Sequence, residues 1–399
     1  MRRILLSCSL MATLIFCAAT PAAGAENQSA APSNKPKIIY RVPKRHYSPE
    51  ELANIRIQAA SSATIPLWNY NDNAYDGNSY QGMMVGRAPY AHGHRSTTIP
   101  TYMIPVILTF ADTGTVFDPT AANACSPNGA SVISLVKGSP LFQNAPFTLN
   151  GVSVASTQYV DAFQRGNFWA FVRGTPYHTV FSTTPTVLPA VRVTVPTKDG
   201  STQTGTCGSY GQMESGWWGN VLENTIFPSL ASKGVGPANF PQFILDSVVE
   251  YDGVPSQCCT LGYHDSFLNN GVFQTLSVNS FDNSGAFGGT TDTMSHEVAE
   301  WMDDPDGSNP VPAWGAEGQV AAGQCQDNLE VGDPLSEGFS TPTNPFSVKM
   351  ANGVTYSLQE LTYFSWFYGD TPSLGSGGLY SDHGTFTGYA MACPPGGSN

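Results

Sequence analysis

The segment Met294–Pro305 limits what this chain can fold into more than any other part of the sequence. It reads Met-Ser-His-Glu-Val-Ala-Glu-Trp-Met-Asp-Asp-Pro, and its closing proline predicts a helix over about 292–303. On such a helix His296 and Glu300, four residues apart, lie one turn apart on the same face. That face carries an imidazole and a carboxylate, which must be either solvated or given a partner.

Basic side chains are missing around this segment. The 115 residues 234–348, between Lys233 and Lys349, contain no Lys or Arg but 16 Asp or Glu. Most of these carboxylates are expected on a solvated acidic surface. Any that converge in a buried place need protons or a bound cation, because the local sequence offers no ammonium or guanidinium group. The sequence therefore predicts a metal site where such carboxylates meet His296.

The helix supplies two metal ligands and a candidate base. His296 and Glu300 are the predicted ligands, and Glu297 stands beside His296, where a general base stands next to a bound metal. The pattern is the His-Glu-x-x-His zinc-binding helix with its second His replaced by Glu. Zinc is the expected metal, and calcium or manganese compete with it because an oxygen ligand replaces a nitrogen.

A further ligand must come from outside the helix. Glu330, in the run Asn-Leu-Glu-Val-Gly-Asp-Pro, is the first choice. Asp333 is the second choice, either as a ligand or as a partner that orients His296. His264 is an outside candidate, as a ligand or as a donor to a developing oxyanion.

The competing interpretation is an ordinary amphipathic helix without a metal. In that case His296 and Glu300 are exposed, and Val298, Trp301 and Met302 pack inward.

The N-terminus has the pattern of a secretory signal peptide over residues 1–25. Basic Arg2 and Arg3 precede the apolar stretch Ile4–Ala19 and a small-residue cleavage site. The apolar stretch is too short for a comfortable membrane span. We therefore expect an exported protein, extracellular or periplasmic, that leaves the membrane once the signal is cleaved.

Six cysteines remain after that cleavage: Cys125, Cys207, Cys258, Cys259, Cys325 and Cys393. An even number in an exported protein indicates disulfides, of open connectivity. The adjacent Cys258 and Cys259 are expected to bond outward to two different partners. No Cys-x-x-Cys spacing is present, which disfavours a cysteine-ligated zinc site.

The chain after the signal divides into a short arm and a large body. Residues 26–61 form a basic arm, flexible apart from a helix at 48–60 that Ser48 and Glu51 begin with a capping box. The arm is either a flexible leader or a pro-segment lying over the site. Residues 62–399 are expected to form one loop-rich domain. A net charge of −13 excludes nucleic acid as an expected partner.

The body is predicted to be α+β, with a mixed β-sheet beside the metal-binding helix. Strands are expected at 64–71, 80–87, 101–110, 115–117, 131–136, 187–195, 242–251, 271–280 and near 346–358. Helices are expected at 157–172, 215–229 and 292–303, the last capped by Thr291 or Asp292.

These motifs resemble those of a known group of proteins. Ser295-His-Glu-x-x-Glu, Asp304-Pro305 and Glu330-x-Gly-Asp together are similar to a group of secreted bacterial proteins with predicted zincin-like metallopeptidase domains. Met84–Pro89, Ser139–Phe142, Gln158–Trp169 and Cys258–His264 also resemble that group, so the likeness spans roughly 62–340. A more remote likeness is to the Exordium, or phosphate-induced, extracellular proteins of plants.

The resemblance implies a zincin-like fold and a secreted zinc metallopeptidase acting on protein or peptide substrates. In that reading Glu297 takes the proton from the water that attacks the peptide carbonyl, and His264 assists at the oxyanion. The alternative is a non-enzymatic protein that binds wall or matrix material and holds a structural metal or none.

Overall fold

A mixed β-sheet with helices on both faces dominates the computed structural model. The structure describes residues 47–59, 63–287, 291–315, 325–336, 346–390 and Cys393, and all of these belong to one compact unit. The expected signal peptide and the arm before Tyr47 lie outside the described residues. The predicted α+β class is confirmed.

The large sheet has seven strands, with β10, β4, β13, β17 and β16 in that spatial order. They are β10 (Val191–Val195), β4 (Thr101–Phe110), β13 (Phe240–Asp246), β17 (Val272–Phe281) and β16 (Gly262–Asn269), with β5 (Val116–Phe117) and β9 (Thr186–Val187) also paired to β4. The first four run parallel, and β16 runs antiparallel to β17 at the end of the order. Buried parallel strands explain the continuous apolar run predicted over 101–110.

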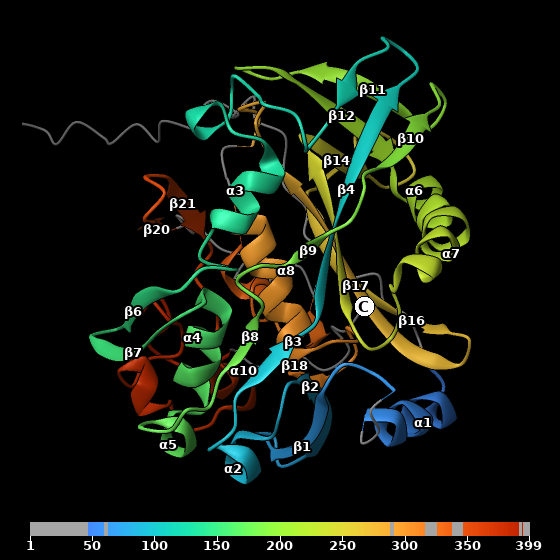
Figure 1. Cartoon of the computed structure of the whole chain (residues 1–399). Coiled ribbons are helices and arrows are strands. Elements are labelled where there is room, and N and C mark those ends of the chain that lie inside the picture. Colours follow the sequence, from blue (N-terminus) through green and yellow to red (C-terminus); the bar gives the residue numbers. More distant parts are fainter. Residues whose placement is uncertain are drawn as a thin grey trace, which may run out of the picture. The chain divides into compact units, whose positions relative to one another are not determined.

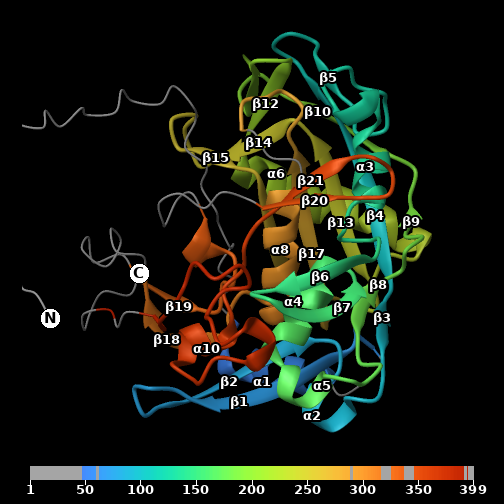
Figure 2. The same cartoon turned by 90° about the vertical axis from the view of Figure 1, so that its left-hand side faces the viewer.

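The two faces of this sheet pack against different helices. On one face, Phe243 and Leu245 of β13 join the cluster formed with α6 (Ser215–Val221), the π-helical turn η2 (Leu222–Ile226) and α7 (Phe227–Leu230). On the other face, Phe240 and Ile244 join the cluster that contains α8 (Asp292–Asp303). This alternation follows the two-residue period of a strand. Figures 1 and 2 show α8 between the sheet and the segments around α4.

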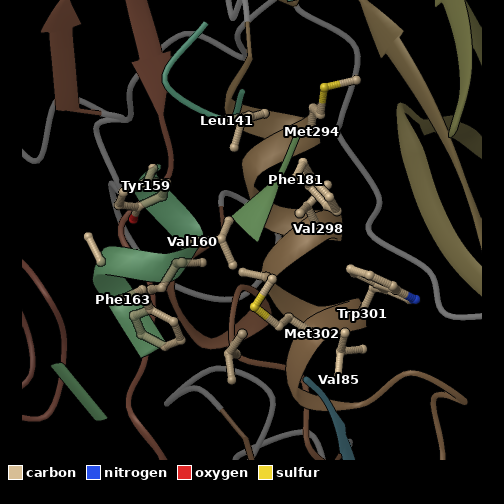
Figure 3. Packing of buried hydrophobic residues seen from close by; sticks show 14 of the residues in the cluster. Val85, Leu141, Tyr159, Val160, Phe163, Phe181, Met294, Val298, Trp301 and Met302 are labelled. Atoms are coloured by element: carbon tan, nitrogen blue, oxygen red, sulfur yellow. The ribbon is translucent and has the colours of Figure 1, made fainter. Parts of the chain in front are cut away.

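The apolar side of α8 forms the centre of the larger core cluster. Trp301 is fully buried, and its ring stacks on Phe240 with 3.6 Å between centroids. Val298 and Met302 lie on the same side as α4 (Tyr159–Asn167), and Figure 3 shows Met302 and Val160 between the two helices. The expected inward packing of Val298, Trp301 and Met302 is confirmed.

Smaller sheets and helices surround this core. The paired strands are β1 (Leu67–Asn73) with β2 (Ser79–Val85), β3 (Thr97–Ile99) with β8 (Thr179–Phe181), β6 (Ala145–Leu149) with β7 (Val152–Thr157), β18 (Pro310–Trp314) with β19 (Gln326–Asn328), and β20 (Phe346–Lys349) with β21 (Thr355–Leu358). A four-stranded sheet contains β11 (Gly200–Thr204), β12 (Ser209–Glu214), β14 (Val248–Tyr251) and β15 (Cys258–Thr260). The short helices are α2 (Pro89–His92), α3 (Val132–Gly138), α5 (Trp169–Val172) and α10 (Phe364–Tyr368).

The first described helix, α1 (Pro49–Ala59), begins with the predicted capping box. Ser48 N–H donates to Glu51 Oε2 at 2.8 Å, and Glu51 N–H donates to Ser48 Oγ at 3.2 Å. The helix rests on the body, because Ile55 is buried in the larger core cluster and the Gln58 amide bonds both Gly271 O and Phe273 N–H.

Four secondary-structure predictions differ from the structure, and one of them is the strand expected over 187–195, which is interrupted between β9 and β10. Residues 131–136 form part of α3 instead of a strand, because the Ser131 side chain caps a helix by accepting from Ser134 N–H. The strand expected over 242–251 is divided at Ser247, whose positive φ of 52° turns β13 into β14 of another sheet. The helix expected over 157–172 breaks at Phe168, which separates α4 from α5.

The cysteines pair in three disulfides, Cys125–Cys207, Cys258–Cys259 and Cys325–Cys393. Disulfides were expected, but the outward bonding of Cys258 and Cys259 is wrong, since these two neighbours bond to each other. The other four cysteines of the described residues already pair with one another, so none of them is left as an outside partner. None of the helices in the described part of the chain has the length and hydrophobicity needed to span a bilayer.

The Phe240–Trp301 stack predicts a large difference between two matched substitutions. Phe240→Ala removes a fully buried ring and should lower the free energy of unfolding by about 3–5 kcal/mol. Phe171→Ala removes a ring that is 55% exposed, and should change it by no more than about 0.5 kcal/mol. Urea unfolding of both variants measures this, and equal losses would contradict the described packing of α8 on the sheet.

Candidate metal centre

All three predicted functional side chains of α8 are buried. His296, Glu297 and Glu300 are each 1% exposed, because the sheet strands β16 and β17 cover one side of the helix and the segments after β19 and β21 cover others. The interpretation with exposed His296 and Glu300 is therefore wrong. Thr291 occupies the N-cap position, but its side chain donates to Ser357 O at 2.8 Å instead of capping the helix.

His296 faces two carboxylates with one ring nitrogen and an amide with the other. Its Nε2 lies 2.9 Å from Glu300 Oε2 and 3.5 Å from Asp333 Oδ1. Its Nδ1 lies 3.0 Å from Gln359 Oε1. An amide oxygen only accepts, so Nδ1 carries a hydrogen and donates. In the neutral ring, Nε2 then has the lone pair that a metal would use.

Gln359, immediately after β21, is itself fixed in orientation. Its side-chain Nε2 donates to Gly332 O, so Oε1 must be the atom that faces His296. Its backbone N–H donates to Ser295 Oγ at 2.9 Å, which ties it to the first part of α8. The amide therefore determines which tautomer His296 adopts.

His264, on strand β16, shows the same arrangement from the opposite side. Its Nε2 lies 3.1 Å from the carbonyl oxygen of Asp304 and must donate to it. Its Nδ1 lies 3.5 Å from Glu297 Oε2 and 3.8 Å from Glu300 Oε2. Both nitrogens thus face protein atoms, which suits a ligand or a charge partner better than a donor to a substrate oxyanion.

The two nearest carboxylates are also held by their outer oxygens. Glu300 Oε1 accepts from the backbone N–H groups of Gly332 and Asp333, at 3.1 and 3.2 Å. Asp333 Oδ2 accepts from Gln326 Nε2 at 3.0 Å. Gly332 is required here, since a Cβ atom would lie 2.4 Å from His296 Nδ1. In each of His296, Glu300 and Asp333, one nitrogen or oxygen atom is held by a hydrogen bond on the outside of the cluster. The other such atom of the side chain points into the cluster.

The inward atoms form two groups that share Glu300. One contains His264, Glu297 and Glu300, the other His296, Glu300 and Asp333, and in each group the ligand atoms lie within 4.8 Å of one another. Ligand atoms around one ion at about 2.0–2.2 Å lie roughly 3–3.5 Å apart. The separations of 2.9 and 3.5 Å around His296 agree with that geometry. These residues could hold a metal ion.

Glu330, the first-choice third ligand, belongs to neither group. It is fully buried, its Oε1 accepts from Asn328 Nδ2, and its Oε2 has no hydrogen-bond partner in the described part of the chain. Burial and the nearby charge of Glu300 raise the pKa of Glu330 well above its usual value. The structure brings the second choice, Asp333, to His296 and places Glu330 nearby as a buried acid.

Within the described ranges, the carboxylates of Glu297, Glu300 and Asp333 form ion pairs with the histidines His264 and His296. Burial lowers the pKa of His296, but Glu300, Glu297 and Asp333 outweigh it and raise the value to about 10. Burial and the charge of Glu300 raise the pKa of Asp333 to about 7. Without a metal the centre therefore holds protons in its place, as the lack of basic residues implied.

Sequence reasoning did not identify Gln359 or the role of Gly332. Gln359 lies far from the helix in the sequence, and an isolated glutamine carries no signal of metal chemistry. Gly332 was part of the motif with Glu330 and Asp333, but only the structure shows why a side chain is excluded there. Comparisons with protein-family models, with curated proteins and with solved structures found no match to this chain.

The fixed orientation of His296 predicts an effect of Gln359 on metal affinity. Gln359→Leu removes the acceptor of the Nδ1 hydrogen, and should weaken zinc binding about 10–100-fold because the ring loses its orientation. Competition with a fluorescent chelator measures this. Gln143→Leu, which removes an amide outside the centre, is the matched control. Equal affinity in the two variants would mean that Gln359 does not orient a ligand.

The raised pKa values predict that the metal-free protein loses stability as the pH rises. Folding raises the pKa of Asp333 from 3.8 to about 7 and that of His296 from 6.5 to about 10. Between the unfolded and the folded pKa of each group, the folded state binds more protons than the unfolded state. Proton binding therefore stabilises the fold fully below the unfolded pKa, and this stabilisation is lost once the pH exceeds the folded pKa. In chelator, the stability difference between the parent and His296→Gln should shrink between pH 6.5 and about 10. Thermal melts in a pH series check this, and a difference that grows with pH would contradict it.

Proposed function

We propose that this chain is an exported, zincin-like, metal-dependent peptidase. His296, Glu300 and Asp333 would hold the metal, and Glu297 would be the general base. The strongest support is the arrangement of His296, Glu300 and Asp333. Each points one nitrogen or oxygen atom toward the others, and its remaining nitrogen or oxygen atom is held by a hydrogen bond. A bound divalent cation would supply Lewis acidity to a peptide carbonyl and to water.

Glu297 has the properties of a proton acceptor. Its Oε2 faces His264, and its Oε1 has no hydrogen-bond partner in the described part of the chain. Burial raises the pKa of Glu297, although the two histidines act in the opposite direction. A carboxylate with a raised pKa accepts a proton from water more effectively at neutral pH. His264 would then hold the carboxylate in place and balance its charge.

The position of β16 supports a peptide as the substrate. This strand is last in the order of the large sheet and carries His264 beside Glu297. An extended peptide can add to a sheet edge through backbone hydrogen bonds, and since Gly262–Ser266 are buried it would have to pair first with the half-buried end of β16, residues 267–269.

A structural metal is the second candidate function, and one observation favours it. Every donor residue of the two groups is at most 4% exposed, so the centre is enclosed by protein in the described ranges. An enclosed site stabilises a fold, whereas a catalytic site keeps one position open to water or substrate. In this version the protein would bind wall or matrix material without hydrolysing it.

Zinc is the proposed metal, with manganese or calcium as competitors. One imidazole and two carboxylates together neutralise a divalent charge, so the site polarises water less than a site with two imidazoles would. More oxygen ligands also favour harder cations.

Substitution of Glu297 distinguishes the two functions. Glu297→Gln should retain stoichiometric metal but lose casein hydrolysis by about 10²–10⁴-fold, because the base is lost while the ligands remain. Glu50→Gln, at an exposed position of α1, is the matched control, and His296→Ala should lose both metal and activity. Metal content and peptide release measure the two properties separately.

The results of these measurements distinguish a peptidase from a protein with a structural metal. Metal in the parent with no hydrolysis on a broad peptide panel would support the structural role. Full activity in Glu297→Gln would end the proposal that this residue is the base. No metal in a parent protein loaded with zinc, manganese or calcium would contradict both functions.

A further inference from the structure

A pocket lies beside α5 and α10, and its lining differs from that of the metal centre. The pocket has a volume of about 410 Å³, within the range of about 300–1,000 Å³ of small-molecule sites, and none of its lining residues belongs to the two metal-ligand groups. Its walls come from β1, from the α4–α5 junction and from residues 364–374. These segments are distant in sequence, so the hollow is a product of the tertiary fold.

Aromatic rings form one part of the wall. Phe168 and Phe364 pack edge to face, with 5.8 Å between their centroids, and Phe168 also packs against Trp68. This network holds the two rings in position. Phe171 at 55% and Leu374 at 72% exposure extend the apolar surface to the rim. The apolar wall therefore consists of a packed part, Phe168 and Phe364, and a part exposed to solvent, Phe171 and Leu374.

Two buried polar groups in the lining lack hydrogen-bond partners. Ser365 is 8% exposed, and its Oγ makes no hydrogen bond in the described part of the chain. Asn167 Oδ1 accepts from Phe364 N–H, but its Nδ2 also makes no hydrogen bond there. Both atoms are covered by protein, so Ser365 Oγ could reach a ligand in the pocket only after its side chain rotates.

A pair of carboxyl groups supplies acceptors. Asp72 and Asp370 line the pocket, share a hydrogen bond with each other and are about half buried. Carboxyl groups that share a hydrogen bond are too close for a glycosidase, whose two carboxyls are separated by at least about 5 Å. The pair is therefore arranged for binding and not for cleavage of a glycosidic bond.

The mixture of donors and acceptors limits the type of ligand. The Arg173 guanidinium donates, and Asp72 and Asp370 accept. An organic ammonium ion would suit the carboxylates and the rings but would oppose the donors. A sugar hydroxyl both donates and accepts, and the C–H face of a sugar ring packs on aromatic rings.

From this combination we propose that the pocket binds a saccharide, one or two sugar rings of a glycan chain. Phe171 and Trp169 offer the surface on which the sugar ring rests, and Asp370 accepts hydrogen bonds from its hydroxyls. The pocket acts independently of the metal centre, so the proposal does not depend on the peptidase function. For an exported protein, such a site would hold the molecule on a polysaccharide.

Calorimetric titration of the full chain tests the proposal. The saccharide probes are cellohexaose, xylohexaose, chitohexaose and mannohexaose. Spermidine and choline test the competing possibility that the pocket binds an organic ammonium ion. At least one oligosaccharide should bind saturably, and Phe171→Ala and Asp370→Asn should each weaken that binding about tenfold or more. Tyr389→Ala, which removes an aromatic ring of 51% exposure outside the pocket, should leave binding unchanged.

Three results would overturn the assignment. These are no binding of any of the four oligosaccharides, unchanged binding in both Phe171→Ala and Asp370→Asn, or binding of the amines alone. Phe171 is largely exposed and Asp370→Asn preserves side-chain shape, so both variants should fold, which a thermal melt verifies. Retention of metal and peptidase activity in these variants would show that the two sites are separate.

Discussion

The convergence of two imidazoles and several carboxylates on Glu300 is the interaction on which the rest of this structure depends. Glu300 Oε2 lies 2.9 Å from His296 Nε2 and 3.8 Å from His264 Nδ1, in a place that solvent does not reach. Burying such a cluster of carboxylates costs free energy unless protons or a cation neutralise their charge. Backbone and amide groups hold the side chains of His264, His296, Glu300 and Asp333 in position around it.

The fold brings the centre together from four places. Helix α8 supplies three side chains, strand β16 supplies His264, the segment after β19 supplies Asp333, and the residue after β21 supplies Gln359. The opposite side of α8 is apolar and faces α4, as Figure 3 shows, and its Trp301 stacks on Phe240 of the large sheet. One side of the helix thus packs into the core and the other side carries His296, Glu297 and Glu300, so core packing sets the positions of these three side chains.

Local signals in the sequence predicted α8, the pairing of His296 with Glu300, the capping box of α1 and the buried strand β4. Each depends on residues close together in the chain. The failures depend on tertiary context. Ser247 redirects a strand into another sheet, Cys258 and Cys259 find each other because the remaining cysteines are already paired, and Gln359 acquires a role only where the fold places it. That Asp333 and not Glu330 lies beside His296 likewise depends on the position of the loop after β19.

Anomalous X-ray scattering from crystals of the zinc-loaded protein would show directly whether His296, Glu300 and Asp333 bind a metal ion. A zinc ion held at this centre should give one strong peak at the zinc edge, about 2.0–2.2 Å from His296 Nε2 and from carboxylate oxygens of Glu300 and Asp333. A map without a peak there, in which His296 and Glu300 remain in direct hydrogen-bond contact while zinc is present in excess, would contradict metal binding at this centre. The cluster would then be a buried proton-sharing network and not a metal centre.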